Sequence, residues 1–380
     1  MLVYLVLLIV SFVPEFIPKF NTNKYKLLVI SIIGLVICFG YTNGSDWRYY
    51  EEFYNDIDLA YPFYEIPFEY GYYFLMLSFR YLNFDFWTFF IFTKIVLYII
   101  NIHFLLKYQK EHFYISFSIY IFLFGLSLYI DNPMRTLIAS TIFLFSYKHL
   151  EAGNIKTYFF IVLLASFFHI VSLLFITLYW LVRKRFGTQT LVISFILFNI
   201  ILWIFDTGIK NIFAINTGIP FIDNKLNFYF ADGASGNVYI ENRIVSFGLI
   251  ARYILFYFVL ISRKHIEEKF GFIFFNLIIS GFFFYRLAIG IPIFERFELF
   301  VVIPFCVAIS STIISFKANS KLIYKLSLYL LMLVLMVKNI TMDYKYIPYT
   351  NYLIYTIQGK KLSYDERSSY NFLNSPYNKK

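Results

Sequence analysis

The stretch FYISFSIYIFLFGLSLYI, residues 113–130, decides the fold class, because it runs for 18 residues without a charged side chain. A helix needs about 20 apolar residues to cross a hydrocarbon core of about 30 Å, so this stretch predicts a transmembrane helix. Similar apolar stretches lie on both sides of it, at residues 2–13, 27–42, 86–106, 134–147, 155–182, 189–205, 244–262, 270–290, 297–316 and 322–340. The sequence therefore predicts an all-α polytopic integral membrane protein with about 10 to 12 transmembrane helices.

Composition indicates the same class. The 380 residues are 60% hydrophobic, 23% aromatic and 15% charged, whereas a soluble domain is roughly 45–50% apolar and about 25% charged. One compact core could not hide 50 Phe and 35 Tyr, but these side chains can face lipid. The net charge of +10 fits loops that face anionic lipid, so nucleic-acid binding is set aside. Cys38 and Cys306 lie in apolar runs, which indicates neither a disulfide framework nor a thiolate metal site.

Basic residues set the predicted orientation. The positive-inside rule assigns the lysine and arginine clusters to the cytoplasm and puts the N-terminus outside. Stretch 155–182 is too long for one upright span, and both of its ends are basic. We therefore predict that it enters and returns as a hairpin, or breaks into two short crossings near Phe168-His169. Residues 1–13 are predicted to be a retained helix, with a cleaved leader as the alternative.

The chain shows no internal repeat or low-complexity linker, so residues 1–380 are predicted to form one domain. Residues 44–84 are predicted to be a periplasmic loop, acidic and aromatic, with short helices. Residues 206–243 would form a second, long periplasmic loop, and residues 341–380 a C-terminal tail on the same side.

Polar residues inside apolar stretches are costly and indicate function. Asn132-Pro133-Met134-Arg135 predicts a helix start, with Asn132 as the N-cap, Pro133 at the first helical position and the helix running to about Lys148. Arg135 would then lie in the first turn, where free backbone N–H groups and a guanidinium form an anion site. The alternative is that Arg135 reaches lipid headgroups from a helix end.

Other polar groups share this predicted outer boundary. His169 lies 14 residues after Ile155, about 21 Å along a helix, which matches the depth of Arg135. It is either a packed hydrogen-bonding residue or a functional one. Arg252, Arg286 and Arg296 either pair internally with Glu241, Glu295 or Glu298, or bind phosphate groups, for which arginine is suited.

The acidic loop alternates aromatic and carboxylate side chains: Asp46, Trp47, Glu69, Tyr70 and Tyr72 belong to it. Such a surface suits sugars, and it equally suits an interfacial amphipathic helix. The sequence has no Gly-rich nucleotide loop, no metal-ligand spacing and no G-x-S-x-G elbow. We therefore predict no metal and no cofactor.

Several short motifs follow one another in an order that resembles the EpsG-like family of Wzy-type polysaccharide polymerases. They are Gly44-Ser45-Asp46-Trp47, Glu69-Tyr70-Gly71-Tyr72, Asn132-Pro133-Met134-Arg135 with Ala139, Ala165-Ser166-Phe167-Phe168-His169, Arg296 with Pro304, and Ile347-Pro348-Tyr349. The resemblance implies a glycosyltransferase that joins undecaprenyl-pyrophosphate-linked repeat units at the outer face of the bacterial inner membrane. A chain-length regulator protein and membrane lipid are further expected partners.

The resemblance also suggests roles. Arg135, with Arg296 and either Arg286 or Arg252, would hold the donor pyrophosphate, and His169 would complete that clamp or act on the acceptor. Asp46, ranked ahead of Glu69, would be the general base, and Trp47, Tyr70 and Tyr72 would contact sugar. Two alternatives stay open: a ligase or other lipid-donor glycosyltransferase, and a flippase for lipid-linked oligosaccharides.

Overall fold

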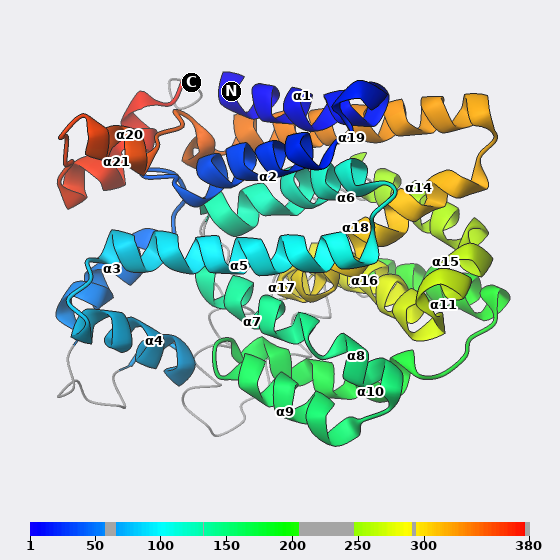
Figure 1. Ribbon diagram of the computed structural model, residues 1–380. Helices are drawn as coiled ribbons and strands as arrows, with labels where there is room; N and C mark the ends of the chain where they lie inside the picture. Colours follow the sequence, from blue (N-terminus) through cyan, green and yellow to red (C-terminus); the bar gives the residue numbers. More distant parts are fainter. Residues whose placement is uncertain (58–65, 132, 205–246, 291–293, 377–380) are drawn as a thin grey trace.

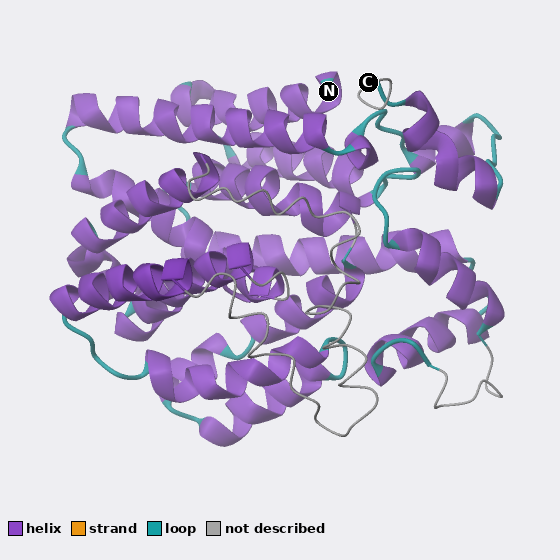
Figure 2. Ribbon diagram, turned by 180° about the vertical axis from the view of Figure 1, so that it is seen from behind, coloured by secondary structure: helices purple, strands orange, loops and turns teal. Residues whose placement is uncertain are grey.

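The computed structural model describes residues 1–57, 66–131, 133–204, 247–290 and 294–376. Over these ranges the chain forms helices and no β-strand (Figure 2), apart from one isolated antiparallel bridge between Gly40 and Asn351. The predicted all-α class is therefore confirmed. The predicted loop at residues 206–243 lies outside the described residues.

Five described segments are long and apolar enough to cross a membrane: Phe86–Tyr108 (α5), Phe113–Asp131, Phe272–Ile289, Arg296–Ser315 and Ala318–Met342 (α19). Shorter apolar segments are Leu2–Phe16 (α1), Ile155–Ser166 (α9), Ile170–Val182, Thr188–Ile204 (α11) and Phe247–Ile261 (α14). The chain is thus a multi-pass membrane protein, while the count of 10 to 12 spans stays a prediction.

Helices α1, α2, α5, α6 and α19 run side by side through the bundle, and α3, α4, α20 and α21 gather at one end of it (Figure 1). We call that end the outer end and the opposite one the basic end. The other bounds are α2 (Asn23–Cys38), α3 (Trp47–Asp56), α4 (Tyr70–Tyr81), α6 (Phe113–Ile119), α7 (Met134–Leu144), α8 (Tyr147–Ala152), α10 (Phe175–Val182), α15 (Arg263–Phe270), α16 (Phe272–Gly290), α17 (Glu295–Glu298), α18 (Val302–Ser311), α20 (Tyr352–Ile357) and α21 (Tyr364–Asn374).

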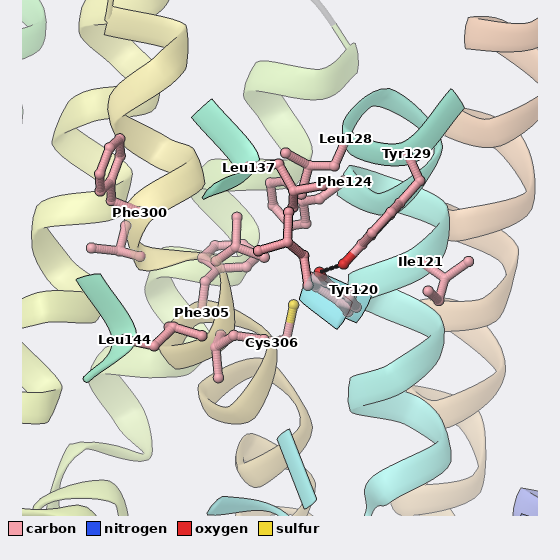
Figure 3. Packing of buried hydrophobic residues seen from close by; sticks show 14 of the residues in the cluster. Tyr120, Ile121, Phe124, Leu128, Tyr129, Leu137, Leu144, Phe300, Phe305 and Cys306 are labelled. Atoms are coloured by element: carbon pink, nitrogen blue, oxygen red, sulfur yellow. Dashed lines mark hydrogen bonds between the residues drawn. The ribbon is translucent and has the colours of Figure 1, made fainter. Parts of the chain in front are cut away.

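The apolar stretch at residues 113–130 is an α-helix only in its first part, α6. Residues Tyr120–Asp131 continue α6 as a π-helix, η3, whose wider turns often mark functional sites. The buried Lys94 amine of α5 donates to the Tyr129 carbonyl of this π-helix at 3.2 Å. Tyr120 and Tyr129 join their hydroxyls at 2.8 Å within the apolar core, beside Phe124, Phe305 and Cys306 (Figure 3). The π-helix ends at Asp131, at the outer end.

Residues 155–182 form the predicted hairpin. Helix α9 ends at Ser166, the chain turns at residues 167–169, and η4 (Ile170–Leu174) with α10 returns. The two ends of the hairpin meet, because the Tyr179 hydroxyl donates to the Gly153 carbonyl at 2.8 Å and Arg183 Nη1 donates to the Leu150 carbonyl at 2.6 Å. His169 therefore lies at the tip of the hairpin, outside both of its helices.

The C-terminal tail holds the start of the acidic loop in place. The Asn43 amide donates to the Lys345 and Pro348 carbonyls at 3.2 and 3.0 Å, and the Thr42 hydroxyl donates to Asn371 at 2.6 Å. These bonds fix the residues just before Asp46 at the outer end of the bundle.

One predicted helix was placed wrongly at both ends. Helix α7 begins at Met134 with Pro133 as its N-cap residue, so Pro133 does not occupy the first helical position. The helix ends at Leu144, and α8 follows as a separate helix, so it does not run to Lys148. Asn132 lies outside the described residues. Arg135 is nevertheless in the first turn of α7, as predicted.

Candidate active site at the outer end

Three separate segments bring Glu69, Arg135 and His169 together. The Arg135 guanidinium contacts Glu69 Oε2 at 2.6 Å. The other carboxylate oxygen of Glu69 accepts the Ile170 backbone N–H at 3.3 Å and lies 3.5 Å from His169 Nδ1. Glu69 and His169 are both buried. The carboxylate of Glu69 therefore links the start of α7 to the tip of the 155–182 hairpin.

The glycine at position 71 allows α4 to pack closely against the tip of the 155–182 hairpin. Its N–H donates to the Phe167 carbonyl at 2.8 Å, and a Cβ built on Gly71 would lie 2.6 Å from that carbonyl oxygen. Only a residue without a side chain lets α4 approach the hairpin tip this closely. The motif Glu69-Tyr70-Gly71 thus places its carboxylate beside His169 through a backbone contact.

A cavity of about 370 Å³ opens beside this cluster. Two arginines and three carboxylates line it, with apolar and aromatic groups between them: Asp46, Asp131, Arg252, Arg296 and Glu298, together with Phe124 and Tyr285 among others. The lining comes from the acidic loop, the π-helix, α14, α16 and α17. Charges of both signs in one pocket suit a reaction that stabilises an anion and removes a proton.

The surroundings of Asp46 raise the pKa of its carboxyl and therefore favour proton uptake. Asp46 lies just before α3, and burial raises the pKa of its carboxyl, while Arg296 lowers that pKa and the nearby Asp131 raises it. Ser45 donates to Asp131 at 2.9 Å, and the Lys345 amine lies 3.4 Å from the same carboxylate. A carboxylate with a raised pKa is better matched to general-base catalysis near neutral pH.

Arg252 lines the cavity and forms an ion pair. Its Nη2 lies 2.6 Å from Glu298 Oε1, and its Cζ is 4.5 to 5.3 Å from the ring centres of Tyr285, Phe305 and Phe124. The internal pairing considered for this residue is therefore present, with Glu298 as the partner. Arg296 also lines the cavity and donates to the Thr136 hydroxyl at 3.4 Å.

Not every predicted residue lies at this site. Arg286 donates to Asn199 of α11 at 2.9 Å and is absent from the lining of the cavity. Trp47 and Tyr72 are fully buried, so their ring faces are closed to a sugar in this structure. Tyr70 is 47% exposed and is the accessible member of the three aromatic residues predicted to contact sugar.

Both ring nitrogens of His169 are buried: Nδ1 lies 3.5 Å from Glu69 Oε1, and Nε2 makes no hydrogen bond to a described residue. Burial lowers the pKa of His169 to about 4, although the Glu69 carboxylate raises it. The imidazole is therefore neutral near pH 7, and it retains a nitrogen that can donate to an incoming group.

Sequence reasoning missed Asp131, which lines the cavity and bonds to Ser45. A signal was present, since Asp131 is the carboxylate that ends the apolar run and immediately precedes the Asn132-Pro133-Met134-Arg135 motif. The Lys345 and Asp343 side chains of the tail, which pair at 3.4 Å, were also missed. Among the described residues, no three His, Cys, Asp or Glu side chains gather as a metal site requires.

The fold and the site define a multi-pass membrane protein that carries a charged, partly buried pocket at one end of its helical bundle. A comparison with protein families identifies it further: the sequence profile of the EpsG family matches residues 2–351, and the chain belongs to that family. This confirms the resemblance carried by the motifs. Comparison with curated proteins and with solved structures finds no match.

Proposed function

We propose that this protein is a polymerase that joins oligosaccharide repeat units carried on a polyprenyl diphosphate, undecaprenyl in bacteria, at the outer face of the cytoplasmic membrane. Membership of the EpsG family indicates a polysaccharide polymerase of the glycosyltransferase type. The lipid-diphosphate donor and the outer face are our proposal. The observation that carries it is the single cavity that combines Asp46 with Arg296 and Arg252.

The reaction needs two groups that this cavity supplies. A hydroxyl oxygen of the acceptor forms a new bond to the anomeric carbon of the donor sugar, and the bond from that carbon to the diphosphate oxygen breaks. Asp46 takes the hydroxyl proton, which its raised pKa favours. Negative charge then develops on the departing diphosphate, and Arg296 stabilises it because a guanidinium offers several donors to phosphate oxygens.

Arg135, Glu69 and His169 would hold the diphosphate from the neighbouring side. Arg135 and Arg296 both lie near enough to Asp46 and to His169 to shift the pKa of each, so the cluster lies close to the cavity. Glu69 already accepts from Arg135 and from the Ile170 N–H, which suits an orienting role better than that of a free base. His169, neutral and with Nε2 making no hydrogen bond to a described residue, would donate a hydrogen bond to phosphate.

Reconstituted protein tests the reaction directly. Purified protein in nanodiscs is given a synthetic polyprenyl-diphosphate oligosaccharide, and the products are separated by size. The proposal expects a ladder of repeats without added nucleotide, and Asp46→Asn should reduce the rate about 100- to 10,000-fold. A wild-type ladder unchanged by Asp46→Asn would remove Asp46 from the mechanism. Transfer of one unit to a different acceptor, with no ladder, would favour a ligase.

The proposed face is tested separately by labelling. Cysteine placed at the exposed Asn55 of α3 should react with an impermeant thiol reagent in intact spheroplasts, and cysteine at the exposed Asn319 of α19 should not. The native Cys38 and Cys306 are buried and give little background. The reverse labelling pattern would show that the proposed orientation in the membrane is wrong.

Transport is the second candidate, and one observation favours it. Arg252 lies in the body of α14 and lines the cavity, as a path for an anionic headgroup through the membrane would require. The pairing with Glu298 at 2.6 Å argues against this role, because it already neutralises the arginine. Vesicles with the lipid-linked unit confined to one leaflet decide: movement across the bilayer without polymer would support transport.

A further inference from the structure

A second cavity, of about 380 Å³, lies at the other end of the bundle, between α5 and α7. It takes no part in the proposed reaction, because α3 and α4 with the acidic loop lie at the opposite end of α5 (Figure 1). We call it the α5–α7 groove. Its walls include Ile99, His103 and Lys107 from α5, Phe145 just after α7, and Lys148 from α8.

Both walls of the α5–α7 groove change from apolar to basic in the same direction. On α5, Ile99, His103 and Lys107 are spaced four residues apart and therefore form one stripe. On the other wall, Phe145 is followed three residues later by Lys148. Ile99 is 60% exposed and Phe145 45% exposed, so the apolar part of the groove is open. An amphiphile with an anionic head matches this gradient.

The two lysine amines are available to such a head. Lys107 lies over the rings of Tyr108 and Phe104, with Nζ 5.4 and 5.8 Å from the ring centres, and both lysines are exposed. An acidic neighbour is Glu151 of α8: burial raises the pKa of its carboxyl, and Lys107 lowers that pKa to a smaller extent. Aromatic contacts thus hold the Lys107 amine at the mouth of the groove, and the Glu151 carboxylate is the repulsive group that a bound anion must face.

We infer that the α5–α7 groove binds an anionic phospholipid, with its acyl chains against Ile99 and Phe145 and its phosphate at Lys107 and Lys148. The positive-inside rule puts this end in the cytoplasmic leaflet, where anionic lipids provide the headgroups. The lipid would fill the space between α5 and α7, and α7 carries Arg135 of the candidate active site at its other end.

Native mass spectrometry of the full-length protein in mixed micelles tests this site. The probes are dioleoyl phosphatidylglycerol and dioleoyl phosphatidylcholine, compared at equal concentration. Each basic residue near an anionic headgroup contributes about fivefold to binding, so the wild type should prefer phosphatidylglycerol by about 25-fold at one site. The Lys107→Gln/Lys148→Gln variant should lose that preference, and Lys107→Arg/Lys148→Arg should keep it.

A matched control separates a site from general surface charge. Lys110 and Lys156 are exposed and do not line the groove, so Lys110→Gln/Lys156→Gln removes two charges without touching it. This control should retain the preference for phosphatidylglycerol. Equal binding of the two lipids by the wild type would overturn the inference, as would equal losses in the two glutamine variants. Competition by millimolar inorganic phosphate alone would also overturn it, because it would indicate a simple anion site.

Discussion

Two arginine–glutamate pairs at the outer end differ in how tightly the rest of the protein encloses them. Arg367 of α21 places one nitrogen 2.6 Å from both oxygens of Glu51, and the rings of Tyr41, Trp47 and Trp87 surround its guanidinium at 5.5 to 5.6 Å. Arg135 contacts Oε2 of Glu69 at 2.6 Å, and its side chain is 25% exposed against 8% for Arg367.

This difference indicates what each pair does. The Arg367–Glu51 pair is closed by aromatic rings and joins the C-terminal helix to α3, as a structural contact does. The Arg135–Glu69 pair is more open: the guanidinium lies 5.2 Å from the Phe68 ring centre but keeps exposed surface, and Nε2 of the adjacent His169 makes no hydrogen bond to a described residue. An open pair of this kind can accept a phosphate group, whereas the closed pair has no room for one.

Breaking the closed pair should have the largest effect, and the effect should be on stability. Arg367→Leu leaves the Glu51 carboxylate buried and unpaired, which costs about 3–5 kcal/mol. Thermal unfolding in detergent, followed by tryptophan fluorescence, measures this loss. The double variant Glu51→Leu/Arg367→Leu should recover much of it, because no isolated charge remains. A double variant as unstable as the single one would mean that the lost ring contacts matter more than the charge.

Arg135→Lys should have the next largest effect, and the effect should be on rate. A lysine keeps the charge but cannot present two parallel donors to phosphate. Loss of one such donor costs about 2.7–4 kcal/mol, or roughly 100- to 1,000-fold in rate, so polymer should shrink to one or a few repeats. The unfolding temperature should change little. Normal polymer length would show that Arg135 only anchors the helix to headgroups.

His169→Gln should have a smaller effect than Arg135→Lys. A glutamine amide can replace a neutral imidazole as a hydrogen-bond donor, so about a tenth or more of the activity should survive. Since burial holds the pKa of His169 near 4, histidine should add no inflection to the wild-type profile between pH 5.5 and 8. Complete loss in the glutamine variant would instead identify His169 as the general base, and full activity in His169→Ala would exclude both roles.

The proximity of Arg135 and His169 could be predicted from the sequence, whereas the Arg135–Glu69 and Arg367–Glu51 pairs could not. The rise per residue gives the depth of His169 along its helix. Arg135 lies in the first turn of a helix that begins at the same depth, so the sequence predicts that the two side chains are close. Glu51 and Arg367 are 316 residues apart, and nothing local to either residue indicates the other.

The remaining differences also arise from contacts that sequence periodicity does not encode. Asp131 reaches the cavity at the end of a π-helix, whereas the apolar run predicted an ordinary helix. Trp47 and Tyr72 looked like exposed loop aromatics, but the loop folds back on α5 and α21 and buries them. Arg286 was placed with the other cations by position in its helix, but it faces α11.

Asp46 provides the most detailed test of the candidate active site, because its charged neighbours shift its pKa in opposite directions. Burial raises the pKa of Asp46, Arg296 lowers it, and Asp131 raises it. A general base must be ionised, so kcat/KM falls as the pH drops through this pKa. Removing a positive charge in Arg296→Gln should move the acid limb to higher pH, and removing a negative charge in Asp131→Asn should move it to lower pH.

The two opposite shifts distinguish Asp46 from any other base, since a base outside the cavity would not respond to both neighbours. Profiles are normalised to each variant's maximum, because Arg296→Gln should also lower the rate by weakening the hold on phosphate. Glu52→Gln is the control: this carboxylate lies on α3, six residues after Asp46, but it accepts from the Tyr364 hydroxyl at 2.6 Å and is exposed. Its profile should superimpose on the wild type. If Arg296→Gln and Asp131→Asn shift the acid limb in the same direction, or leave it in place, Asp46 is not the base, and the ionisation that controls polymerisation lies outside this cavity.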